Sequence, residues 1–452
     1  MARLKEYNGY YCESEYEYAF IGFLETEGWI YSSGNNISRV TKRDVLIADD
    51  FKKFIVDTNP DLTEDEVTQI FDNVRLVGSE SDFATLHKVY GWMVNGIQFT
   101  PQDGIARMIP LIDFKKDSNK NIFRVVNQFT VEYTNNGQKE NRRPDVLLFV
   151  NGMPLCVIEL KNPADANATI YDAWEQINIR YWRDIPHLLH YCTLACISDG
   201  VKTRLGTVHT PYEHFYAWRR VNDGDAVYTL PFEETETMIK GVYAPERFLE
   251  IFRDYIYFQD SIYDSDEVEI VCRYPQFFAA RLLKQSIIKS VVEKSGKGGT
   301  YFGATGCGKT YTMAFLARQL ALRCIDIPEI GSPTIILIVD RDELQKQGSK
   351  LFTKSKEFLN LGEVAVVKNR AQLRQELGAR QSGGFYICTI QKFCDREDDK
   401  IGLINDRQNI ICFSDEAHRT QLEHSKKIQF SKDADENMKA MVSKPYAKVL
   451  KE

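Results

Sequence analysis

Residues 142–163 read RRPDVLLFVNGMPLCVIELKNP, and this stretch decides the fold of the N-terminal half of the chain. It contains two apolar runs, at residues 145–150 and 155–160, on either side of Asn151-Gly152. Runs of this length with an Asn-Gly pair between them are typical of a β-hairpin with a tight turn. We therefore expect two neighbouring antiparallel strands, followed by a helix over residues 168–181.

The hairpin carries ionisable groups at its open end. Asp145 starts the first run, Glu159 lies near the end of the second, and Lys161 follows two residues later. A three-residue loop, 151–153, would place Asp145 directly opposite Glu159 on one face of the sheet, with Lys161 on the same face. A strict two-residue loop would place the two carboxylates on opposite faces. Their meeting therefore requires a three-residue loop or a β-bulge.

Two carboxylates and a lysine at this spacing suit the cleavage of phosphodiesters. Asp145 and Glu159 can hold Mg²⁺, which acts as a Lewis acid, and Lys161 can orient or deprotonate the attacking water. The pattern, Pro-Asp followed by Glu-x-Lys, resembles the PD-(D/E)xK nuclease superfamily. The alternative is a hairpin whose charges only face solvent, but Glu159 ends a strongly apolar run, where a charge needs a reason. We predict catalytic roles for all three residues and metal binding by the two carboxylates.

Residues 303–310 read GATGCGKT, a complete phosphate-binding G-x-x-x-x-G-K-T loop. The glycines let backbone N–H groups cradle phosphates, Lys309 neutralises them, and Thr310 offers a hydroxyl to Mg²⁺ at a helix N-terminus. We expect a short strand before the loop, at residues 300–302, and a helix from Lys309 onward. The alternative is an ordinary glycine-rich turn at a helix start. The residues predicted to bind nucleotide in this loop are Gly303, Thr305, Gly306, Cys307, Gly308, Lys309 and Thr310.

An acidic motif follows about a hundred residues later. The apolar run 410–413 leads toward Asp415-Glu416, and ligands of open α/β sheets bind at the carboxyl ends of the strands. Asp415 can hold Mg²⁺, and Glu416 can orient or deprotonate the water that attacks the nucleotide. Further apolar runs, at 334–339 and 386–389, alternate with helical patterns. The C-terminal half is thus predicted to be an α/β domain with a parallel sheet.

Together these motifs resemble the motor of superfamily-two helicases and, more narrowly, the restriction (R, motor and nuclease) subunit of type I restriction–modification enzymes. The likeness is carried by DEAH at 415–418, DRDEL at 340–344 and TIQKF at 389–393. That family has an Arg-Tyr-x-Gln stretch ahead of the phosphate-binding loop, and residues 273–276 match it. The resemblance implies a RecA-like lobe in which Gln276 recognises adenine.

The hairpin region resembles the same subunit, which strengthens both assignments. The family usually has Gln-x-x-x-Tyr on the helix after the hairpin. Here Tyr181 fits, but Ile177 stands at the Gln position and Gln176 lies one residue early, so the role of Gln176 stays open. Glu17, in a helix predicted at residues 16–28, is expected to be a solvated charge rather than a metal ligand.

The chain has 452 residues, which is too many for one core, and its 43% apolar and 27% charged residues are ordinary for a globular protein. No apolar run reaches the ~18 residues of a membrane span. The net charge of −7 does not indicate a nucleic-acid binder, but a basic groove can lie in an acidic chain. We predict a PD-(D/E)xK domain with a mixed sheet flanked by helices at 1–220, a connector at 221–269, and an incomplete first RecA-like lobe at 270–452.

The resemblance implies the restriction subunit of an ATP-dependent type I endonuclease in the cytoplasm of a bacterium or archaeon. The implied cofactors are ATP and Mg²⁺. The implied partners are double-stranded DNA and the modification (methyltransferase) and specificity subunits, with no membrane. Such a subunit translocates DNA at the expense of ATP and cuts both strands far from the recognition site.

Two other classes of protein stay open. One is a helicase or remodelling ATPase whose N-terminal domain binds nucleic acid without cutting it, and loss of cleavage on replacing Asp145 or Lys161 would exclude that class. The other is a non-catalytic assembly module with vestigial sites. The intact motif residues Lys309, Asp415 and Glu416 argue against the second class.

The end of the sequence is expected to be that of a fragment. Residues 436–452 are predicted to form a helix, close behind the DEAH motif. A motor of this class also needs a further coupling motif and a second lobe with an arginine finger, which is typically worth ~10³–10⁵ in rate. Such a piece is expected to bind ATP weakly, to hydrolyse little of it and not to translocate.

Overall fold

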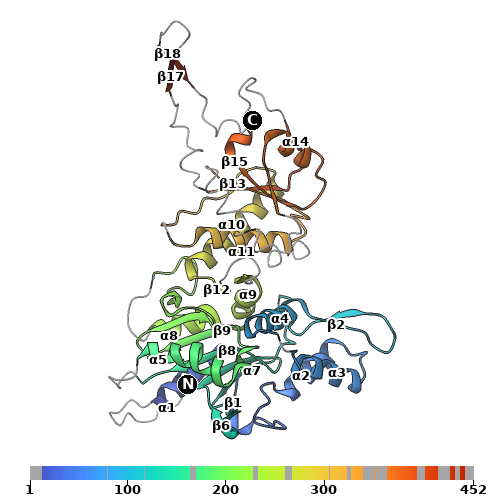
Figure 1. The fold of residues 1–452 in the computed structure, drawn as a ribbon, viewed down its shortest axis with the longest axis vertical. Coiled ribbons are helices and arrows are strands. Elements are labelled where there is room, and N and C mark those ends of the chain that lie inside the picture. The colour runs from blue at the N-terminus through green and yellow to red at the C-terminus, as the bar shows by residue number, and fades with distance from the viewer. Residues whose placement is uncertain are drawn as a thin grey trace. The chain divides into compact units, whose positions relative to one another are not determined.

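The computed structural model describes residues 13–78, 80–116, 118–162, 169–227, 233–259, 267–304, 306–322, 327–339, 352, 364–393, 403–415, 428–432 and 438–442 (Figure 1). The chain divides into two compact units, Met1–Tyr274 and Pro275–Glu452, and each is described by itself. Within the described residues, no helix is both long enough and apolar enough to cross a membrane.

The first unit is built on a six-stranded mixed sheet with the order β1-β4-β7-β8-β9-β10 (Figure 1). Its strands are β1 (Ile30–Ser33), β4 (Phe123–Asn127), β7 (Val146–Val150), β8 (Met153–Leu160), β9 (Leu194–Ser198) and β10 (Thr203–Thr207). β1 runs parallel to β4 and β8 parallel to β9, whereas the remaining neighbours are antiparallel. Every residue of β7, β8 and β9 is buried, so these strands form the centre of the core, as their continuous apolar runs predict.

Helices cover both faces of this sheet. The elements involved are α1 (Glu13–Thr26), α5 (Ile170–Glu175), the π-helix η2 (Gln176–Tyr181), α6 (Trp182–Asp184) and α7 (Pro186–Leu189). The Tyr16 hydroxyl of α1 hydrogen bonds to Ser198, which is paired with Leu160, whereas Tyr181 of η2 hydrogen bonds to Glu159. Because adjacent residues of a strand face opposite sides, α1 and η2 lie on opposite faces of the sheet.

Further helices and two hairpins complete the N-terminal part of this unit. They are η1 (Gly34–Asn36), α2 (Ala48–Thr58), α3 (Glu64–Arg75), α4 (Asp82–Asn95), η3 (Tyr212–His214) and the hairpins β2 (Ile97–Phe99) with β3 (Arg107–Ile109) and β5 (Val131–Asn135) with β6 (Gln138–Arg142). α2 packs against α3 (Figure 1). Thr63 and Glu66 form a reciprocal capping box at the start of α3, which supplies partners for backbone N–H groups that the helix leaves unpaired.

The segment predicted to be a connector, residues 221–269, belongs to the first unit. It contains α8 (Glu233–Met238), the π-helix η4 (Ile239–Tyr243), α9 (Pro245–Asp254), β11 (Ile256–Gln259) and most of β12 (Val268–Val271). The Trp29 indole N–H donates to the carbonyl of Tyr243, and the Tyr90 hydroxyl donates to the carbonyl of Phe252. The aromatic side chains of Tyr243, Phe248, Phe252 and Tyr257 are fully buried, so this segment is part of the core of the first unit.

The second unit contains the predicted parallel sheet. Its strands are β14 (Val364–Val366), β15 (Phe385–Thr389), β13 (Thr334–Val339) and β16 (Ile410–Ser414), in that order and all parallel. Its helices are α10 (Tyr274–Glu293), α11 (Lys309–Leu322), α14 (Arg370–Gly378) and the short η6 (Ile390–Phe393), and β17 (Ile428–Lys432) pairs with β18 (Met438–Val442). Ile336, Ile338, Leu373 and Leu377 share one buried apolar cluster, so α14 packs on this sheet.

Two local predictions for this unit are wrong. Residues 300–302 do not form a strand: Phe302 is 95% exposed, so the segment has no apolar anchor in the sheet. Within the helix predicted at 436–452, Met438–Val442 is a strand, because antiparallel pairing with β17 satisfies its backbone groups instead. The rest of that predicted helix lies outside the described residues.

Candidate functional site

A two-residue turn joins β7 and β8. Asn151 and Gly152 both have positive φ angles, 51° and 76°, which is the conformation of a type I′ hairpin turn. The N–H of Ile47 donates to the carbonyl of Gly152 at 2.8 Å. This contact brings the two backbones so close that a side chain on Gly152 would collide with the carbonyl oxygen of Ile47. The three-residue loop is therefore not the one used, and taken alone this turn would put Asp145 and Glu159 on opposite faces.

A β-bulge restores the register that brings the carboxylates together. The pairing of β7 with β8 shifts by one residue between Leu148 and Phe149, so that Val146 pairs with Ile158. The next position outward sets Asp145 beside Glu159, and the N–H of Asp145 donates to Glu159 Oε1 at 3.4 Å. The sequence left a loop or a bulge as alternatives, and the structure has the bulge.

Asp145, Glu159 and Lys161 form one cluster at the open end of the hairpin. The N–H of Leu160 donates to Asp145 Oδ2 at 2.9 Å, and Lys161 Nζ lies 3.9 Å from Glu159 Oε2. Glu159 is fully buried and the Lys161 side chain is 14% exposed. The three residues predicted from the sequence to act together are thus in contact.

Gln176 completes the cluster. Lys161 Nζ donates to Gln176 Oε1 at 3.0 Å, and Gln176 Nε2 donates to the Tyr181 hydroxyl at 2.8 Å. The Tyr181 hydroxyl donates in turn to Glu159 Oε1 at 2.6 Å. We call this closed set of contacts the Lys161–Gln176–Tyr181–Glu159 ring.

The π-helix explains how Gln176 reaches this position. Gln176 and Tyr181 are five residues apart, one more than in the Gln-x-x-x-Tyr arrangement. A π-helix has a wider turn, with i→i+5 hydrogen bonds, so it brings residues at this longer spacing onto the same face. The π-helix η2 thus absorbs the additional residue, and Gln176 contacts Lys161.

Burial and mutual repulsion govern the charges of the two acids. Burial, and next the Asp145 charge, raise the pKa of Glu159 well above its usual value, and Lys161 opposes them. Burial also raises the pKa of Asp145, against the Leu160 N–H and the Lys161 charge. The two acids repel each other and share a single lysine as their counter-charge, and an added cation would offset this repulsion.

The donor set fits Mg²⁺. Glu159 Oε2 is buried and has no hydrogen-bond partner among the described atoms. Mg²⁺ prefers oxygen ligands and is usually held by one or two carboxylates together with water and substrate phosphate. The described residues contain no group of three or more His, Cys, Asp or Glu side chains that could hold a metal ion, so an ion held by Asp145 and Glu159 would need water or phosphate as further ligands.

Glu17 is not the solvated charge that the sequence suggested. It is 5% exposed, and its two oxygens accept hydrogen bonds from Asn127 Nδ2 at 2.6 Å and Gln128 Nε2 at 2.7 Å. Gln128 adopts a positive φ of 54°, and its N–H donates to the Asp145 carbonyl at 3.1 Å. Asn127 is paired with Val146, so Glu17 supports the start of β7 from the face opposite the carboxylate cluster. The polar Asn-Gln pair directly after an apolar strand was the available signal.

In the second unit the phosphate-binding loop leads into α11 at Lys309, as predicted. Gly306 and Gly308 have φ angles of 79° and 81°, and Lys309 Nζ donates to the Gly303 carbonyl at 3.3 Å. Thr310 lies in the first turn of α11. Thr305 lies outside the described residues.

Gln276, the residue predicted to recognise adenine, lies against this loop. Its Nε2 donates to the carbonyls of Gly308 at 3.1 Å and Cys307 at 3.3 Å. A side chain at Gly308 would collide with that amide nitrogen. The structure therefore brings Gln276 and the loop together, although they are about thirty residues apart.

Asp415 directly follows β16 at the carboxyl end of the parallel sheet. Its N–H donates to the carbonyl of Ile338 on the neighbouring β13 at 2.9 Å. This is the end of an α/β sheet at which ligands bind. Glu416 lies outside the described residues.

Comparisons with known proteins match both halves of the chain. Residues 10–214 match the model of the family described as type I restriction enzyme R protein N terminus, and residues 275–446 match that of the SWI2/SNF2 ATPase. The chain is 30% identical over 438 residues to the type I restriction enzyme HindI endonuclease subunit of Haemophilus influenzae, covering 93% of this chain and 40% of that protein. It is also 30% identical over 434 residues to the putative type I restriction enzyme MjaIXP endonuclease subunit of Methanocaldococcus jannaschii, covering 89% and 39%.

The chain thus joins a nuclease-like α/β domain to an ATPase domain of the SWI2/SNF2 type. Its first domain belongs to the family of type I restriction enzyme R protein N termini, and endonuclease subunits of type I restriction enzymes are its homologues. The chain spans about two-fifths of the length of these curated relatives.

Proposed function

We propose that this chain supplies the DNA-cleaving centre and the nucleotide-binding lobe of a type I restriction endonuclease subunit. The complete subunit cuts both strands of DNA with Mg²⁺ and uses ATP to move DNA, together with modification and specificity subunits. The observation that carries the proposal is the Lys161–Gln176–Tyr181–Glu159 ring, with Asp145 beside it. The matches of both domains support the same assignment.

In the nuclease centre each side chain has a separate task. Asp145 and Glu159 hold Mg²⁺, which when bound supplies Lewis-acid activation of the phosphate and of water. Gln176 accepts a hydrogen bond from Lys161 and so aims its ammonium group, which orients the attacking water or stabilises the charge that develops on the phosphate. Tyr181 fixes one oxygen of Glu159 and leaves the other, the unpartnered Oε2, for the metal.

In the ATPase lobe the loop residues Gly303 to Thr310, Thr305 and Cys307 included, cradle the phosphates with backbone N–H groups. Lys309 contacts the β- and γ-phosphates, and Thr310 and Asp415 hold the nucleotide's Mg²⁺. Gln276 pairs with the adenine edge, and Glu416 orients the water.

Cleavage is favoured over a nucleic-acid-binding domain that does not cut. A fully buried carboxylate with a second, partly buried one beside it is destabilising unless it is compensated, and a binding surface gains nothing from it. A catalytic metal centre does require two such groups in this place. The burial of Glu159, and the ring of contacts that holds it, therefore support a nuclease function.

The proposal is tested in the complex with the modification and specificity subunits of the same system, using plasmid DNA, Mg²⁺ and ATP. Asp145→Asn, Glu159→Gln or Lys161→Ala is expected to abolish cleavage and spare ATP hydrolysis, because the two sites lie in separate units. Lys309→Ala is expected to abolish ATP turnover and leave the first unit folded. Glu267→Gln replaces an exposed carboxylate and is the control, which is expected to cleave normally. Normal cleavage by all three nuclease variants would refute the proposal.

A further inference from the structure

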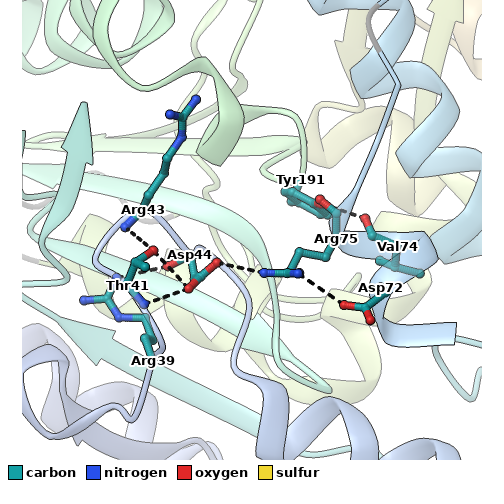
Figure 2. A network of polar contacts seen from close by, with 8 residues as sticks. All are labelled: Arg39, Thr41, Arg43, Asp44, Asp72, Val74, Arg75 and Tyr191. Carbon is teal, nitrogen blue, oxygen red and sulfur yellow. Dashed lines mark hydrogen bonds and ion pairs between the residues drawn. The ribbon is translucent and has the colours of Figure 1, made fainter. Parts of the chain in front are cut away.

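The loop of residues 38–44, SRVTKRD, is held rigidly in place; we call it the SRVTKRD loop. Asp44 Oδ2 accepts hydrogen bonds from the N–H of Thr41 at 2.8 Å and from its hydroxyl at 3.1 Å (Figure 2). The other oxygen, Oδ1, accepts from Arg75 Nη1 of α3 at 3.4 Å. The one acidic residue of the loop is therefore occupied by the loop itself and by α3.

Arg39 anchors the loop from inside. Its Nη1 donates to the carbonyls of Asp44 at 3.1 Å and Thr130 at 3.0 Å, and its guanidinium carbon lies 3.8 Å from the centre of the Phe129 ring. Burial lowers the pKa of Arg39, but an arginine in a protein keeps its charge. The Arg39 guanidinium makes its contacts within the protein, so it adds positive charge to the loop but does not extend toward a ligand.

Lys42 and Arg43 differ from Arg39 because both are exposed. Within the described part of the chain, neither makes an ion pair within 4.0 Å. Arg43 extends away from the contacts around Asp44 (Figure 2). Val40 is 92% exposed on the same loop. A structured loop thus presents two cations and one apolar side chain, while its only anion is satisfied.

The loop lies beside the start of β7. The carbonyl of Lys42 accepts a hydrogen bond from the N–H of Glu132 at 3.0 Å, and Gln128 binds the carbonyl of Asp145. At about 3.3 Å per residue, the four residues from Gln128 to Glu132 span at most about 13 Å. One strand of duplex DNA advances about 3.4 Å per phosphate, so this span corresponds to at most about four base pairs.

We propose that the SRVTKRD loop is a docking surface for the phosphate backbone of duplex DNA, which it holds within about four base pairs of the phosphate that is cut. This inference rests on the proposed nuclease function. Lys42 and Arg43 contact phosphates, and Val40 packs against the sugar edge. Arg143, which is exposed two residues before Asp145, continues the positive charge toward the centre.

The test measures the affinity of the full chain for a labelled 30-base-pair duplex at 50 to 200 mM salt, in EDTA to prevent cutting. Each phosphate contact contributes about 0.9 to the slope of log affinity against log salt, so Lys42→Ala with Arg43→Ala should lower the slope by about 1.8. The ratio of wild-type to variant affinity for the duplex should therefore fall about tenfold as the salt concentration rises from 50 to 200 mM. Exchanging the two cations, Lys42→Arg with Arg43→Lys, should keep the wild-type slope.

The matched control is Lys115→Ala with Lys116→Ala. These exposed lysines belong to a segment that hydrogen bonds, through Asn121, to Asn151 at the turn end of β7 and β8, away from the centre. Equal slopes for the loop variant and the wild-type chain, an equal loss in the control, or no measurable duplex binding by the wild-type chain would each overturn the inference. Metal binding at Glu159 is measured without DNA, so failure of the loop inference and failure of the nuclease assignment give different results.

Discussion

Replacement of Glu159 by Gln separates the two properties of the buried carboxylate, the stability of the fold and the capacity to hold metal. Gln keeps the shape of Glu159, and its Oε1 can still accept the hydrogen bond from Tyr181. Its amide nitrogen takes the place of Oε2, which has no hydrogen-bond partner among the described atoms, and can donate to the neighbouring Asp145 carboxylate. The substitution removes a buried charge from beside another acid and loses only the Lys161 contact at 3.9 Å.

The expected gain in stability without metal is about 1–3 kcal/mol, the usual penalty of an unsatisfied buried polar group. In a unit of this size 1 kcal/mol changes the melting temperature by about 2–4 °C, so the metal-free variant should melt roughly 2–12 °C above the wild-type chain. The wild-type chain should gain about 2.7 kcal/mol from Mg²⁺ at a hundred times its Kd. The variant should gain almost nothing, so Mg²⁺ should narrow or reverse the difference.

Tryptophan fluorescence reports on the unfolding of the first unit, Met1–Tyr274, alone. All five tryptophans of the chain, at positions 29, 92, 174, 182 and 218, lie before residue 275. Melting curves would be recorded in EDTA and in Mg²⁺ for the wild-type chain, for Glu159→Gln and for the exposed control Glu267→Gln. The control should follow the wild-type chain in both buffers.

Two results would refute the reasoning. If Mg²⁺ stabilised Glu159→Gln as much as the wild-type chain, Glu159 would not hold the ion. If the variant melted below the wild-type chain in EDTA, the buried charge would be compensated by its neighbours and would not be a source of strain.

Three further variants test other parts of the molecule. Gln176→Ala should reduce cleavage about 10–100-fold, the usual loss when a residue supporting a metal centre is removed, and leave ATPase activity unchanged, because Lys161 loses its acceptor; wild-type cleavage would exclude a positioning role. Burial raises the pKa of Glu269 well above its usual value, so the wild-type chain loses stability as pH rises above about 4.3, the value in the unfolded chain. Glu269→Gln should therefore gain melting temperature relative to the wild-type chain between pH 5 and pH 8, whereas Glu267→Gln should not, and a constant difference would contradict this. Gly308→Ala should abolish ATP binding measured by calorimetry, because its left-handed φ of 81° and the nearby glutamine amide leave no room for a side chain; unchanged binding would show that the loop rearranges.

The sequence alone determined the elements that depend on local chemistry. Apolar runs bounded by turn residues identified β7, β8, β13, β15 and β16, and the glycine-rich loop identified the start of α11. Side-chain spacing on the two strands of the hairpin also predicted that Asp145, Glu159 and Lys161 meet, and they are in contact. These features could be predicted because alternation of side chains, turn preferences and motif spacing operate over a few residues.

Only the tertiary structure decided how those elements meet. The β-bulge between Leu148 and Phe149 set Asp145 beside Glu159, and the π-helix brought Gln176 to Lys161. Burial of Glu17 depended on amides about 110 residues away, and the aromatic connector became core by packing on distant elements. Register, helix type and burial are fixed by contacts between residues far apart in the chain. The free energies of these contacts differ only slightly from local preferences, so the sequence of a single segment does not reveal which of them decides the structure.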